Sequence, residues 1–155
     1  MMKIDRAFCV CFVTLVCASL AHANNDEWND PTGGNWSDYT NWSNGNAPHV
    51  SDQASFDKAG TYRVSYDEVT QTIQDLFVSG GGNVTLDSIY GAPLLNVNSV
   101  GGGQNVVVAD GATFTLGYAG AVTHALTLNA GATLYVQTGG TLNVFQGSTV
   151  TATTL

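Results

Sequence analysis

The sequence predicts an all-β fold: a right-handed parallel β-helix, or β-solenoid, with an aromatic N-terminal cap. The chain has 155 residues, of which 18 are Gly and only 10% are charged, a composition typical of short strands joined by tight turns. From Leu76 to Leu155 apolar and polar residues alternate, as they do in strands with one face in a core. The same region repeats itself, which favours stacked coils.

Residues 1–23 are predicted to be a secretory signal peptide. Two basic residues precede an apolar run over residues 7–20, which is shorter than the roughly 20 residues that a spanning helix needs. Ala-His-Ala at 21–23 is a small-x-small cleavage pattern, so the mature chain would begin at Asn24 and carry no membrane span. An uncleaved anchor is the alternative. All three Cys lie inside this leader, so the mature chain must be stable without disulfides.

The mature chain is expected to divide near residue 76. Residues 24–75 hold all three Trp and most of the charge, and form the predicted Trp-rich cap and first strands. Residues 76–155 form the predicted Gly/Thr-rich solenoid repeats and contain only two charged residues, Asp87 and Asp110. The formal net charge of the whole chain is −8. That balance excludes a nucleic-acid binder, because phosphates require clustered Lys and Arg.

The repeats set the predicted register. Residues 106–116 match residues 126–136 after a shift of 20, and residues 142–152 after a further shift of 16. Each unit is interpreted as two strands joined at a Gly, and a period near 20 is interpreted as one coil, stacked at about 4.8 Å on the next. An antiparallel sandwich is the competing fold, but it does not require such in-register similarity. The predicted core positions are Val106, Val108, Phe114, Leu116, Leu126, Leu128, Leu134, Val136, Leu142, Val144, Val150 and Ala152.

The N-terminal zone carries a distinctive pattern, W…GNW…NW…G…P…D…F…GTYxV, over residues 28–64. It resembles the start of large secreted bacterial repeat proteins, including autotransporter passengers and PEP-CTERM-type exported proteins. Gly-Gly-Thr-Leu at residues 139–142 is similar to the β-helix repeats that follow in those proteins. The resemblance implies an exported structural or adhesive segment. The sequence holds neither the β-barrel nor the sorting tail of such proteins, so we expect a fragment of a longer chain.

Two interpretations of the aromatic residues remain open. In the first, Trp28, Trp36 and Trp42 cover the open end of the first coil, since a solenoid needs a lid and aromatic side chains bury large areas. In the second, they are exposed and stack on sugar rings, and the candidate glycan-binding residues are then Trp28, Trp36, Tyr39 and Trp42. The cap is the favoured interpretation.

Signals for catalysis are weak. His49 and His124 each stand alone, and the acidic residues match no known calcium-binding spacing. Residues 76–155 contain no Lys or Arg, which argues against the lyases that use this architecture. We therefore expect no catalytic, cofactor or metal site.

The predicted function is a non-enzymatic structural or adhesive segment of a cell-surface or secreted protein. Its expected partners are an extracellular glycan or matrix, or a second copy at the open solenoid edge. The alternatives are a carbohydrate-binding module, and the N-terminal part of a polysaccharide-degrading β-helix enzyme.

Overall fold

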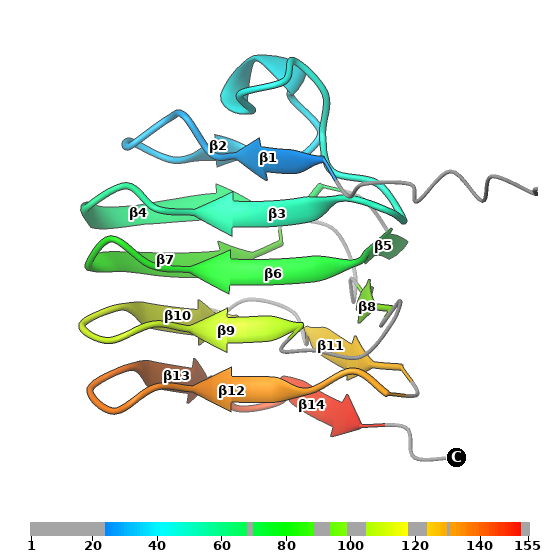
Figure 1. Ribbon diagram of the computed structural model, residues 1–155, viewed down its shortest axis with the longest axis vertical. Helices are drawn as coiled ribbons and strands as arrows, with labels where there is room; N and C mark the ends of the chain where they lie inside the picture. Colours follow the sequence, from blue (N-terminus) through cyan, green and yellow to red (C-terminus); the bar gives the residue numbers. More distant parts are fainter. Residues whose placement is uncertain are drawn as a thin grey trace, which may run out of the picture.

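The computed structural model describes residues 24–67, 70–88, 94–98, 105–117, 124–129 and 131–152. The predicted signal peptide lies outside these residues. Within them the strands pair in parallel and build three sheets that wrap around one core (Figure 1). The first sheet contains β1 (Asn25–Glu27), β3 (Gln53–Phe56), β6 (Asp75–Val78), β9 (Val106–Val108) and β12 (Leu134–Val136). The second sheet contains β2 (Gly34–Asn35), β4 (Gly60–Ser65), β7 (Gly82–Asp87), β10 (Thr113–Leu116) and β13 (Thr141–Val144). The third contains β5 (Thr70–Ile73), β8 (Leu94–Val97), β11 (Ala125–Leu128) and β14 (Thr149–Ala152).

The chain adds one strand to the first, the second and the third sheet in turn, which completes a coil. The next coil begins again in the first sheet, further from the N-terminal strands. Seen along the solenoid axis from the β1 end, the path in Figure 1 turns clockwise as it moves away from the viewer, so the solenoid is right-handed. Four coils contribute a strand to every sheet, and β1 and β2 form a partial coil above them. The predicted fold class is confirmed.

The predicted coil period near 20 is wrong in the Gly/Thr-rich repeats. Val106 pairs with Leu134, whereas its predicted partner Leu126 lies in β11 of the third sheet. The coil from Ala54 to its partner Leu76 spans 22 residues, close to the prediction, whereas the next coil, from Leu76 to Val106, spans 30. The error arises because every strand of a solenoid has the same alternation and many end at a Gly turn. Two successive strand-turn-strand segments therefore resemble each other although they lie on different sheets.

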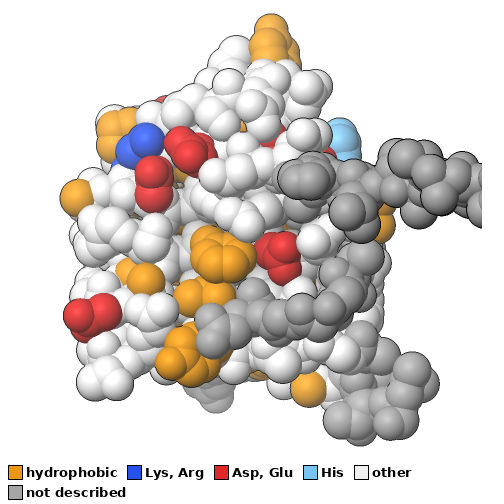
Figure 2. All heavy atoms as spheres, viewed as in Figure 1, with side chains coloured by type: hydrophobic (Ala, Val, Ile, Leu, Met, Phe, Trp, Pro, Cys, Tyr) orange, Lys and Arg blue, Asp and Glu red, His pale blue; other side chains and the backbone are white. Residues whose placement is uncertain are grey.

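The alternating apolar residues point inward, as predicted, and form a continuous core. All the predicted core positions from Val106 to Leu128 are buried. In the last coil Leu134, Leu142 and Val150 are only partly buried, and the predicted core positions Val136, Val144 and Ala152 are exposed. No further coil packs there in the part of the chain that the structure describes. On the face shown in Figure 2, charged side chains are sparse.

The N-terminal end is closed by the connection between β2 and β3. This segment contains a single short 3-10 turn, η1 (Tyr39–Asn41), whose N-cap Asp38 accepts a hydrogen bond from the backbone N–H of Thr40 at 3.0 Å. Trp28 and Trp42 form an isolated antiparallel bridge below it. Figure 1 shows the segment lying over the uppermost coil.

Candidate functional site

The three tryptophans form one buried cluster beneath η1. Trp28 and Trp36 are 0% exposed and Trp42 is 2% exposed. Trp42 meets Trp28 and Trp36 edge-on, with ring centroids 5.0 and 4.9 Å apart, and the ring of Phe56 lies 5.7 Å below it. These edge-to-face contacts are the geometry that aromatic rings prefer.

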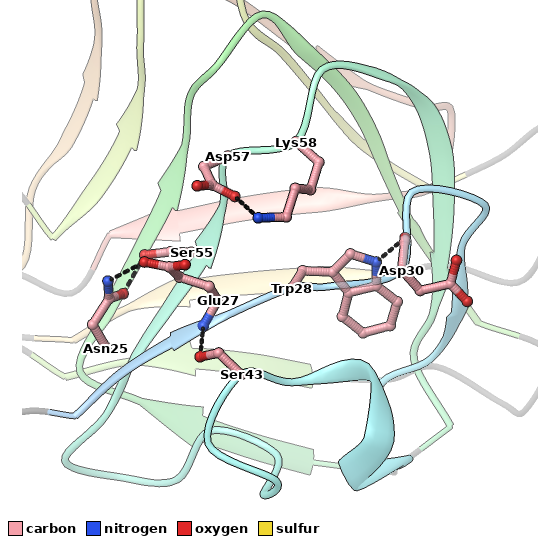
Figure 3. A network of polar contacts seen from close by, with 8 residues as sticks. All are labelled: Asn25, Glu27, Trp28, Asp30, Ser43, Ser55, Asp57 and Lys58. Carbon is pink, nitrogen blue, oxygen red and sulfur yellow. Dashed lines mark hydrogen bonds and ion pairs between the residues drawn. The ribbon is translucent and has the colours of Figure 1, made fainter.

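Two of the three indole N–H groups, those of Trp28 and Trp42, are hydrogen-bonded to nearby backbone, whereas the buried Nε1 of Trp36 has no such bond among the described residues. Trp42 Nε1 donates to the carbonyl of Trp36 at 2.8 Å, and Trp28 Nε1 donates to the carbonyl of Asp30 at 2.5 Å. Figure 3 shows Trp28 beside β1, where the backbone N–H of Glu27 donates to the hydroxyl of Ser43 at 3.0 Å. The segment that follows η1 is thereby fastened to the first strand.

This geometry confirms the aromatic cap. The tryptophans have no exposed ring face on which a sugar could stack, so the alternative interpretation, in which they are exposed, is wrong. The fourth candidate residue, Tyr39, is 63% exposed and lies on the outer surface of η1. The structure therefore does not bring the four candidate glycan-binding residues together on one surface.

The acidic residues of the N-terminal zone shape turns. Asp30 and Asp38 each accept hydrogen bonds from the threonine two residues later, at 2.6–3.0 Å, and these bonds lower the pKa of both carboxyls. Asp26 is buried, which raises the pKa of its carboxyl, although a hydrogen bond from Asn44 partly opposes this. Within the described ranges no group of three His, Cys, Asp or Glu residues could hold a metal ion.

A buried ion cluster lies at the corner between the second and third sheets. Asp87, the last residue of β7, is 0% exposed and forms an ion pair with the guanidinium of Arg63 in β4. On its other side Asp87 Oδ1 lies 3.3 Å from Nε2 of His124, which directly precedes β11 and is 1% exposed. The prediction that His124 stands alone is wrong, because the solenoid brings residues from three successive coils together.

The cluster is closed to solvent on the His124 side. The backbone N–H of His124 donates to the hydroxyl of Ser148 at 3.3 Å, and the backbone N–H of Tyr66 donates to the carbonyl of Asp87 at 2.5 Å. A cavity of about 10 Å³ beside the imidazole has room for about one water molecule. It is lined by Tyr66, Leu86, Leu95, Leu116, His124 and Ala125. With Asp87 and His124 both buried, the arrangement joins coils and offers no surface to a substrate.

This cluster could not be predicted from the sequence, because the register between strands of successive coils was not known. Asp87 was visible as one of two charges in a zone that otherwise has none. Arg63 lies far before it in the chain and His124 lies far after it, at unequal separations. Neither spacing suggests a contact until the coil lengths are known.

No family model, no curated protein and no solved structure matches the chain. No helix among the described residues is long and apolar enough to cross a membrane.

Proposed function

We propose that this chain is a non-enzymatic structural segment of an exported protein, and that its outer surface adheres to an extracellular glycan or matrix. Export is inferred from the leader over residues 1–23. The adhesive role rests on the outer surface of the solenoid, where short neutral polar side chains recur from coil to coil.

The observation that carries the proposal is the alignment of these side chains. In the second sheet the register aligns Thr61, Asn83, Thr113 and Thr141 in one outward column. In the third sheet it aligns Thr72, Asn96, Thr127 and Thr151. Repeated hydroxyl and amide groups on a rigid sheet can make many weak, regularly spaced hydrogen bonds with a polymer, and many weak contacts add up to strong attachment.

Export is tested by expressing the whole chain in a Gram-negative host and sequencing the N-terminus of the product in each cell fraction. We expect a chain that begins at Asn24 outside the cytoplasm. The matched control, Leu15→Arg, interrupts the apolar run of the leader and should stay in the cytoplasm. If the unmodified chain is retained unprocessed, export is refuted.

Adhesion is tested with the purified chain over residues 24–155, labelled and applied to immobilised bacterial cell-wall material and to a panel of polysaccharides. We expect binding that is saturable and that disappears when the protein is unfolded by heat. If the folded and unfolded chains bind equally, or neither binds, an adhesive surface built by the solenoid is refuted.

A further inference from the structure

The first sheet carries an apolar column on its outer face. Phe77 in β6 and Val107 in β9 each lie between two residues that point into the core. Since successive side chains of a strand point to opposite faces, Phe77 and Val107 point outward. The register aligns Phe77 with Val107 and Val107 with Tyr135 of β12. Tyr135 is 44% exposed, Phe77 is partly exposed, and Val107, only 4% exposed, lies recessed between them. We call these three residues the outer aromatic column; Figure 2 shows a hydrophobic patch on this face.

Polar side chains flank the outer aromatic column. Just before it lies Asp75, which is half-buried and is held in place by the buried Asn105, whose Nδ2 donates to Asp75 Oδ1 at 2.8 Å. Ser79 and Gln137 follow it at the ends of β6 and β12. Sugar binding needs this combination, because the apolar face of a sugar ring packs on an aromatic ring while its hydroxyls bond to carboxylates, amides and hydroxyls at the edge.

The spacing of the two aromatic residues fits a polymer that runs along the solenoid axis. Phe77 and Tyr135 are two strands apart in the sheet, which at the usual strand spacing of about 4.8 Å is a separation of about 10 Å. That separation is comparable with the repeat of two sugar units in an extended β-1,4-linked chain. The net charge of −8 disfavours an acidic polymer, because like charges repel across the interface.

We propose that the outer aromatic column binds a neutral β-linked polysaccharide, with the polymer lying along the axis and Phe77 and Tyr135 packing against alternate sugar rings. The inference rests on the proposed adhesive function and deepens it by naming the surface and the class of glycan. It also places the aromatic contacts on the outer face of the first sheet instead of on the buried tryptophans.

The test is affinity electrophoresis of the chain over residues 24–155 in gels that contain hydroxyethylcellulose, mixed-linkage β-glucan or alginate, followed by calorimetric titration with any polymer that retards it. Tyr135→Ala removes the most exposed ring of the column. Phe77→Leu removes the second ring but keeps most of its apolar volume, which protects the fold. Tyr39→Ala is the matched control, since Tyr39 is also exposed but lies on η1. Circular dichroism establishes that each variant is folded.

We expect at least one neutral polymer to bind, alginate to bind less well, and each column variant to weaken binding about tenfold while Tyr39→Ala has no effect. If the wild-type chain binds neither neutral polymer, or prefers alginate, the proposed ligand is wrong. If it binds a neutral polymer and both folded column variants bind equally well, the outer aromatic column is not the site, while glycan adhesion by another face stands.

Discussion

Removing the charge of Asp87 is expected to destabilise the solenoid strongly. Asp87→Asn keeps the size of the side chain but takes away the negative charge that lies between Arg63 and His124. Breaking a buried ion pair costs about 3–5 kcal/mol, because the remaining partner is left without compensation in a desolvated place. The side chain of Arg63 is 47% exposed and can turn towards water, whereas that of His124 is 1% exposed and cannot. Because the guanidinium of Arg63 keeps access to water, the loss should fall below that range, and we expect about 2 kcal/mol.

The assay is urea unfolding of the chain over residues 24–155 at pH 7, followed both by far-ultraviolet circular dichroism and by tryptophan fluorescence. Two probes are needed because the coils of a repeat protein can unfold in steps, while all the tryptophans report on the cap. The matched control is Asp110→Asn, which removes an exposed charge from a turn and should change stability by no more than about 0.5 kcal/mol. A result in which Asp87→Asn is as stable as Asp110→Asn would refute the reasoning.

Three further predictions follow from the packing. At Gly80 a Cβ would overlap the carbonyl oxygen of Asp57, whereas at Gly81 it would meet nothing within 4 Å; since both have positive φ, Gly80→Ala should lower the urea midpoint clearly more than Gly81→Ala. Burial, and secondarily the charge of Asp57, raises the pKa of Tyr62 to about 12. The folded chain thus holds this proton more tightly than the unfolded chain, so stability should fall as the pH rises from about 10 towards 12, and Tyr62→Phe should remove that part of the slope. Val144 is 43% exposed on the inward row of the last coil, so Val144→Asp should reduce any concentration-dependent association seen by sedimentation velocity.

The sequence was sufficient for the parts of the fold that depend on local pattern. Alternation of apolar and polar residues decides which face of each strand is buried, and the inward positions of β9, β10 and β11 were predicted from it correctly. The concentration of Trp in one segment likewise indicated the cap. Both features follow from the preference of individual side chains for the core, which needs no knowledge of the partner strand.

The register could not be predicted in the same way. A coil closes only when its turns have the right lengths, and those lengths vary: the coil that leads from Ala54 to its partner Leu76 is shorter than the next, which leads from Leu76 to Val106. Similar strands on different sheets then look like repeats of one another. Without the register, the sequence could not place Arg63 and His124 beside Asp87, or align Phe77 with Tyr135. The ion cluster and the outer aromatic column were both missed for this one reason.

Each of the three corners of the solenoid holds successive coils together by a different means. Between the first and second sheets the chain turns at glycines whose backbone touches the coil above, as at Gly80. Between the third and first sheets side-chain hydrogen bonds join successive coils: the amide of Asn129 donates to that of Asn98, and the amide of Asn105 donates to the carboxylate of Asp75. Between the second and third sheets, the cluster of Arg63, Asp87 and His124 holds the coils together.

At the corner of Asp87 a fully buried carboxylate joins residues from three successive coils. Within a sheet, backbone hydrogen bonds and the apolar core bind each coil to its neighbours. At a corner the backbone ladder is interrupted, so side-chain contacts contribute more. Since each coil of a solenoid contacts only the adjacent coils, loss of the carboxylate should first separate the coils that contain Arg63, Asp87 and His124, and leave the aromatic cap packed. Circular dichroism of Asp87→Asn should therefore change at a lower urea concentration than its tryptophan fluorescence, whereas Gly81→Ala should keep the two transitions together.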